Sequence, residues 1–198
     1  MKLDSRFRTG DFATGLNNEI TVTVRVLGPS WAKADRLDLY ANGQLIHTRP
    51  IKPGSDIEKA NLKLTLPRPK HDAHLIAIAT GPGITEPFWE SPRPYVPTSP
   101  KHEPRLQGAT NPIFIDGDGD GKYTAPRQQA EQLLVKHPKN LDALFGALAG
   151  FDAAVAAQLA ALLHQAGHDL QSPKLKAKWS KIRTIAVGFE AFIATQED

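Results

Sequence analysis

The chain of 198 residues carries 24 Lys and Arg against 21 Asp and Glu, and this net charge of +3 is too small for a nucleic-acid-binding protein. It contains no cysteine, which excludes a disulfide framework, a thiolate nucleophile and a cysteine-ligated zinc site. No apolar stretch approaches the roughly 20 residues of a membrane span, so we expect neither nucleic acid nor a membrane among its partners.

Residues 1–81 have the pattern of a domain made of short strands. Residues 19–27 alternate β-branched and polar side chains, which predicts a half-buried strand. Residues 61–66 alternate in the same way, and residues 73–80 are apolar on both faces, as a central strand is. Short strands separated by turns, with no helical pattern between them, predict an antiparallel β-sandwich of immunoglobulin-like type.

A hairpin is expected at Asn42-Gly43, between two apolar runs. Both residues tolerate the positive φ of the tight turn that joins two antiparallel strands. Residues directly opposite one another in such a hairpin share a face of the sheet. We therefore expect Leu39 and Ile46 to lie in the core, and Asp38 and His47 to lie at the surface.

A proline-rich connector is expected over residues 82–110, because six prolines fall between positions 87 and 104. Its aromatic side chains would anchor it to the sandwich. An alternative is a sugar-stacking platform, which would make the chain a carbohydrate- or cell-surface-binding module. The aromatic residues in question are Trp31, Tyr40, Phe88, Trp89 and Tyr95.

Residues 111–125 combine a last strand with an aspartate-rich loop, and this loop is the most specific motif of the sequence. Calcium prefers six to eight hard oxygen ligands, and alternate residues of a tight loop can direct three carboxylates at one point. The spacing predicts an EF-hand-like calcium site formed by Asp116, Asp118 and Asp120. The backbone carbonyl of Lys122 would add a ligand, and Thr124 would bind directly or through water.

The twelfth position of this loop departs from a full EF-hand. A bidentate acid occupies that position in EF-hands, whereas Arg127 occupies it here. Glu131, one helical turn later, could substitute for that acid. The alternatives are a weaker calcium site or a solvated acidic turn before a helix. In either calcium-binding case the ion would rigidify a junction and would not catalyse a reaction.

Two histidines, His71 and His74, are the other candidate metal ligands. Residues i and i+3 of a strand face opposite sides of the sheet, so the two imidazoles would diverge. The sequence contains no hydrolase motif, phosphate-binding loop or dinucleotide fingerprint. The hypothesis that these histidines and the aspartates form an active site is therefore the least favoured one. We expect no catalytic residues in this chain.

Residues 126–198 have the 3.6-residue periodicity of a small helical bundle. Two short helices are expected on either side of Pro138. A third helix would begin at the capping residue Asp152 and end at Gly167. A last, continuous helix is expected after Ser172-Pro173, because proline favours the first helical position.

Three phrases of the sequence resemble the C-terminal region of bacterial hydrolases of the PHP type (polymerase and histidinol phosphatase). They are RFRTGDFATGL, WAKADRLDLYANGQ and TNPIFIDGDGDGKYT. The resemblance covers nearly the whole chain from about Arg6, and residues 111–122 are its most specific part. It implies a β-sandwich, an acidic loop and a helical tail that follow a metal-dependent catalytic domain.

The catalytic residues of that family lie in the preceding domain, so the resemblance assigns none to this chain. The expected function is a non-catalytic, calcium-stabilised accessory module, whose partner is a metallohydrolase catalytic domain in cis or in trans. The N-terminal sequence lacks the apolar core of a signal peptide. The expected location is cytoplasmic as the sequence stands, or exported if the chain is a piece of a longer precursor.

Overall fold

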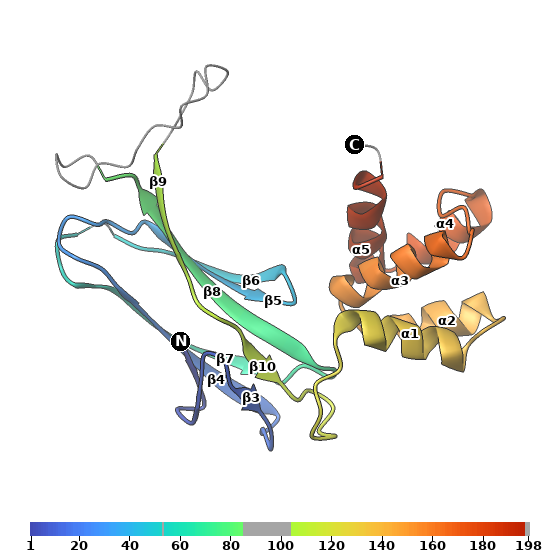
Figure 1. Cartoon of the computed structure of the whole chain (residues 1–198), viewed down its shortest axis with the longest axis horizontal. Helices are drawn as coiled ribbons and strands as arrows, with labels where there is room; N and C mark the ends of the chain where they lie inside the picture. The colour runs from blue at the N-terminus through green and yellow to red at the C-terminus, as the bar shows by residue number, and fades with distance from the viewer. Residues whose placement is uncertain (53, 85–103, 197–198) are drawn as a thin grey trace. The chain divides into compact units, whose positions relative to one another are not determined.

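The computed structural model describes residues 1–52, 54–84 and 104–196, and Figure 1 traces them in chain order. Two compact units divide the chain. The strand unit comprises residues 1–41, 45–68 and 74–114, and the helical unit comprises residues 42–44, 69–73 and 115–198. Most of the predicted connector, with its three aromatic residues, lies outside the described residues.

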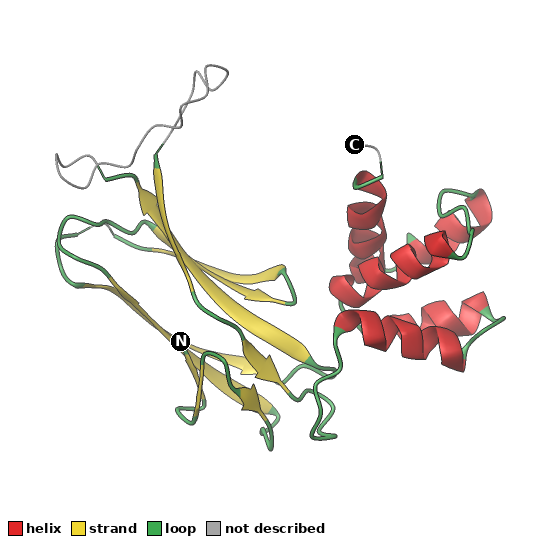
Figure 2. Cartoon of the chain, in the orientation of Figure 1, coloured by secondary structure: helices red, strands yellow, loops and turns green. Residues whose placement is uncertain are grey.

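Two β-sheets precede the helices along the chain (Figure 2), as the sequence predicts. One sheet has the strand order β2-β1-β4-β7, and the other has the order β3-β10-β8-β5-β6 with β9 also paired to β8. This arrangement fits a β-sandwich. The strands are β1 (Lys2–Leu3), β2 (Phe7–Arg8), β3 (Phe12–Ala13), β4 (Glu19–Leu27), β5 (Arg36–Ala41), β6 (Gln44–Pro50), β7 (Glu58–Pro67), β8 (Ala73–Pro82), β9 (Arg105–Ala109) and β10 (Ile113–Ile115).

The alternating pattern of β4 is confirmed by its burial. Ile20, Val22 and Val24 are almost completely buried, and β4 pairs antiparallel with β7 along its whole length. In the other sheet, β8 is an inner strand with Leu75 and Ala77 in the core. Burial of these β-branched and leucine side chains is the main favourable term that holds the strands together.

The hairpin at Asn42-Gly43 forms with positive φ at both residues, as predicted. The prediction for its side chains is wrong at two positions, because Ile46 is 42% exposed and Asp38 is only 3% exposed. The reason is that β5 is an inner strand that is buried on both faces, whereas β6 is the outermost strand of its sheet. The buried Asp38 carboxylate is satisfied by the Thr48 hydroxyl and an ion pair with Arg36.

The helices of the helical unit begin directly after the aspartate loop. They are α1 (Pro126–Lys136), α2 (Leu141–Leu148), α3 (Ala153–Gln165), α4 (Pro173–Trp179) and α5 (Arg183–Ala194). The Asp152 side chain caps α3 by accepting from the N–H groups of Ala154 and Val155, as the sequence predicts. Within the described residues, no helix has both the length and the apolar character needed to cross a bilayer.

The predicted last helix is wrong in one respect, because it is two helices. Ile182 has φ −117° and ψ 118°, an extended conformation that separates α4 from α5. The break lets Trp179 stack on Phe189 with ring centroids 5.6 Å apart. The Trp179 indole also donates to the Leu170 carbonyl at 2.9 Å. Packing and a buried hydrogen bond therefore outweigh the continuous apolar stripe.

The core of the helical unit depends on a close approach between α3 and α5. A Cβ atom at Gly188 would lie 2.4 Å from the Ala153 carbonyl oxygen, 2.6 Å from the Ala156 Cβ and 2.8 Å from the Ala157 nitrogen. Backbone atoms make up most of this contact, so a side chain there would push the helices apart.

We predict that Gly188→Ala lowers the free energy of unfolding by roughly 1–3 kcal/mol through overpacking. Gly146→Ala on α2 is the matched control, because a Cβ there meets nothing within 4 Å. That control should raise the free energy of unfolding by roughly 0.5–1 kcal/mol through helix propensity. Urea denaturation followed by circular dichroism measures both, and equal effects of the two substitutions would contradict the packing account.

Candidate metal centre

The aspartate loop occupies the short interval between β10 and α1. Asp116 follows the last residue of β10 directly and is only 3% exposed. Its Oδ1 accepts from the Gly119 N–H at 2.7 Å and its Oδ2 accepts from the Gly121 N–H at 3.1 Å. Both glycines have positive φ, +83° and +78°, a conformation that other residues adopt at a cost. The Asp116 carboxylate therefore holds the loop in a tight turn.

The next two aspartates each bond within the loop. Asp118 accepts from the Asp120 N–H at 3.2 Å, and Asp120 accepts from the Lys122 N–H at 2.7 Å. Both carboxylates are exposed, in contrast with Asp116. Each carboxylate oxygen has two lone pairs, so these bonds leave capacity for a further ligand.

A fourth aspartate, Asp72, reaches the loop from the segment between β7 and β8. It is fully buried, with 0% exposure. Its Oδ1 accepts from the Gly117 N–H at 2.8 Å, and its Oδ2 accepts from the Thr124 N–H at 2.6 Å. One buried carboxylate therefore joins the two ends of the loop through charge-assisted hydrogen bonds, which are about twice as strong as neutral ones.

The chain passes unusually close to itself beside this carboxylate. A Cβ at Gly117 would lie 2.0 Å from the His71 carbonyl oxygen and 3.0 Å from the Asp72 nitrogen. Only glycine fits this contact without a backbone shift. On the other side, the Gln129 amide of α1 donates to the carbonyl oxygens of Asp72 and Thr124, at 3.4 and 3.0 Å. The loop, the segment before β8 and the first turn of α1 therefore form one connected structure.

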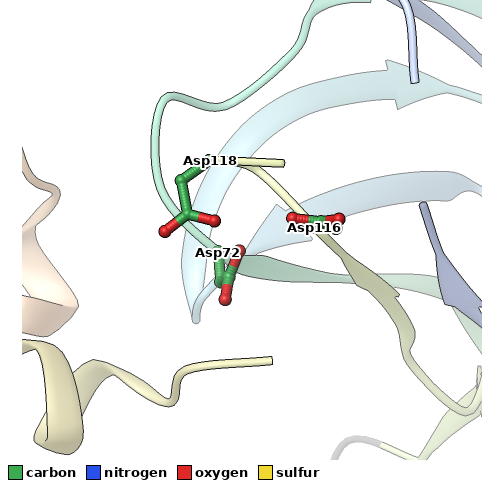
Figure 3. A group of neighbouring side chains, drawn as sticks. All are labelled: Asp72, Asp116 and Asp118. Atoms are coloured by element: carbon green, nitrogen blue, oxygen red, sulfur yellow. The ribbon is translucent and has the colours of Figure 1, made fainter. Parts of the chain in front are cut away.

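Three of these carboxylates converge, as Figure 3 shows for Asp72, Asp116 and Asp118. One oxygen of each lies within 4.8 Å of the others. Two oxygens on opposite sides of one calcium ion are at most about 4.6–5.2 Å apart, since each Ca–O bond is about 2.3–2.6 Å long. The three carboxylates therefore fit around a single calcium ion as they stand.

The local charge favours a cation at this point. Among the residues that the structure describes, no ion pair joins Asp72, Asp116 or Asp118 to a basic side chain. Burial raises the pKa of the neighbouring Tyr123, and the negative charges of Asp72 and Asp152 raise it further. Like charges in a buried site repel one another strongly, and a bound cation would remove that repulsion.

The structure brings together only part of the predicted ligand set. Asp116 and Asp118 belong to the converging group, and Asp120 does not. Thr124 is placed by its backbone bond to Asp72, and Lys122 is exposed. Glu131, the predicted substitute for the twelfth-position acid, pairs with Arg127 at 3.1 Å.

Sequence reasoning missed Asp72, which lies 44 residues before Asp116 along the chain. The sequence offers His71 and His74 as candidate ligands, and the pattern assigns no role to Asp72 beside them. Its burial next to a Gly-rich acidic loop is a tertiary effect that periodicity does not reveal.

The two histidines have separate structural partners. The His71 ring packs 5.1 Å from Phe151, and the His74 ring packs 6.3 Å from Phe114. Neither belongs to the converging group of candidate ligands found among the described residues. Of the aromatic residues in the alternative sugar-stacking platform, Trp31 is 44% exposed and Tyr40 is half-buried.

A second polar contact lies at the start of α3. The Nε2 atom of His71 lies 3.1 Å from Oδ2 of Asp152, and Asn42 donates to the same oxygen at 2.8 Å. Burial alone would raise the pKa of Asp152. The contact with His71 and the hydrogen bonds from Asn42 and the Val155 N–H outweigh burial, so that its pKa lies below the ordinary value of 3.8.

Because the folded-state pKa is lowered, ionised Asp152 contributes stability that is fully present above pH 3.8 and is lost as the pH falls further. We predict that Asp152→Asn, which keeps a good capping residue, destabilises the protein at pH 5 to 6. The difference in the free energy of unfolding between this variant and the unsubstituted protein should shrink as the pH falls below 3.8. Denaturant midpoints across this range measure it, with exposed Asp56→Asn as the background control. A difference in stability that does not change with pH would contradict the lowered pKa of Asp152.

Comparisons of the chain with protein-family models, with curated proteins and with solved structures found no match. The resemblance to PHP-type hydrolases therefore stays an expectation from the sequence. The function proposed below therefore rests on the geometry of the converging carboxylates.

Proposed function

We propose that this chain is a non-catalytic accessory module whose aspartate loop binds one structural calcium ion. Asp72, Asp116 and Asp118 would supply carboxylate ligands. The observation that carries the proposal is their convergence within 4.8 Å, with two of the three carboxylates buried. Backbone carbonyls and water would complete the six to eight oxygens that calcium takes.

In this proposal Asp72 takes the place of the acid missing from the twelfth position of the loop. An EF-hand draws that ligand from the helix after the loop, whereas this chain would draw it from the segment before β8. Calcium suits the site better than magnesium, because magnesium needs oxygens at about 2.0–2.1 Å in near-octahedral geometry. Calcium accepts longer bonds and less regular geometry, which suits three carboxylates that backbone hydrogen bonds already hold in place.

A bound ion would have a structural effect on the helical unit. It would neutralise buried negative charge and fix the loop that leads from β10 into α1. In this proposal the ion stabilises the loop and takes no part in a reaction. The proposed partner, a metallohydrolase catalytic domain in cis or in trans, and an immunoglobulin-like class for the sandwich rest on the sequence pattern and resemblance alone.

Thermal unfolding with calcium and with excess chelator tests whether the chain binds calcium. A ligand that binds only the folded state stabilises it by about 2.7 kcal/mol at a hundred times its dissociation constant. We predict a rise of several degrees with calcium for the unsubstituted chain, and no rise for Asp118→Asn. Asp120→Asn, the matched control from the same loop, should keep most of the rise, because Asp120 lies outside the converging group.

Superimposable melting curves with and without calcium would contradict the proposal that the loop binds a calcium ion. An equal loss in both variants would instead support the ligand set predicted from the sequence over the one proposed here. A non-catalytic module should not hydrolyse phosphoesters. The proposal would be contradicted if the purified chain and Asp118→Asn both hydrolysed them at a rate proportional to chain concentration across independent preparations.

A further inference from the structure

A cleft opens between the two sheets of the strand unit. Its volume is about 320 Å³, and it is lined by the end of β4, by residues 79–81 of β8 and by residues 106–108 of β9. A second cavity of about 180 Å³ shares Leu27, Ala79 and Gly108 with it and extends to Val24 and Ala77 of the core. The two cavities therefore adjoin one another, and we refer to them together as the passage.

The cleft exists because small residues line this end of the sandwich. Ala32, Ala34, Ala79, Gly28 and Gly108 all contribute to its wall. On one side of β4, strand β1 pairs only with Val22 and Thr23, so residues 24–27 have no strand there among the described residues. Small side chains and this unpaired stretch of β4 therefore leave room for the cleft at this end of the strand unit.

The charged residues that line the cleft are both basic. Lys33 and Lys59 both line the cleft, and in the described part of the chain neither forms an ion pair with an acid. Two neighbouring carboxylates are already engaged, Glu58 by Arg25 at 2.7 Å and Asp35 by Arg105 at 3.5 Å. The Lys59 ammonium group donates to the Gly54 carbonyl oxygen at 3.2 Å, which is a neutral partner. Both lysines therefore keep a positive charge that no described acid pairs with.

We propose that this cleft binds an amphipathic carboxylate, such as a medium-chain fatty acid, with its chain between the sheets and its carboxylate at Lys33 and Lys59. Concave apolar sites of about 300–1,000 Å³ with a few polar groups are typical of small-molecule binding. The mostly apolar wall favours an alkyl chain over a sugar, and the two lysines favour an anion over a neutral or cationic amphiphile. This proposal is independent of the calcium site.

Isothermal titration of the full chain with octanoate, decanoate and dodecanoate, below their micelle concentrations, tests the proposal. The affinity should rise by about fourfold per added methylene until the passage is filled. Decanoate should bind more tightly than decanol, which has the same chain length without the charge. Absence of binding, or equal binding of decanoate and decanol, would overturn the proposal.

Two variants locate the site. Gly108 lies on the same face of β9 as Leu106, and a Cβ there meets nothing within 4 Å, so Gly108→Leu should fill the cleft and abolish decanoate binding. Lys33→Met should weaken binding by roughly two- to fivefold, the range for an exposed charge pair. Lys52→Met, a change outside the cleft lining, is the control and should leave binding unchanged.

Each variant is first checked by its thermal melt. If Gly108→Leu fails to fold, Lys33→Met against Lys52→Met still decides the outcome. Unchanged binding in a folded Gly108→Leu variant, or equal effects of the two lysine substitutions, would overturn the assignment of the ligand to this cleft.

Discussion

The fully buried Asp72 carboxylate accepts hydrogen bonds from the backbone N–H groups of Gly117 and Thr124. Most of the structure around the aspartate loop depends on these two hydrogen bonds. They close the aspartate loop at both ends, directly before α1 begins. Burial of an ionised carboxylate is costly unless hydrogen bonds or a cation compensate the charge. The same side chain therefore fixes the shape of the loop, and a bound cation there would further offset its buried charge.

A polar network extends from the Asp72 backbone carbonyl through the helical unit. The Asn42 amide donates to the Asp72 carbonyl oxygen at 3.4 Å and to the Asp152 carboxylate at 2.8 Å. Asp152 in turn caps α3, and Gln129 of α1 bonds to the Asp72 segment. Buried polar networks are strongly coupled, because the loss of one partner leaves the others unsatisfied. A cation at the loop would therefore also stabilise the start of α3.

Local patterns in the sequence predict much of this structure. The alternation of β4, the Asn42-Gly43 turn and the Asp152 cap each depend on neighbouring residues, and all three are confirmed. Predictions that needed tertiary information were wrong or incomplete. The burial of Asp38 depends on the inner position of β5, the break before α5 depends on Trp179 packing, and the contribution of Asp72 depends on chain segments 44 residues apart. Periodicity describes one element at a time and contains none of these contacts.

A crystal structure of the chain grown with calcium tests the central claim most directly, because it identifies the ligands of the ion. The account predicts an anomalous peak with oxygens of Asp72, Asp116 and Asp118 at about 2.3–2.6 Å. A peak bound by Asp116, Asp118 and Asp120 without Asp72 would contradict the ligand set. A loop without a peak at saturating calcium would contradict the metal site itself.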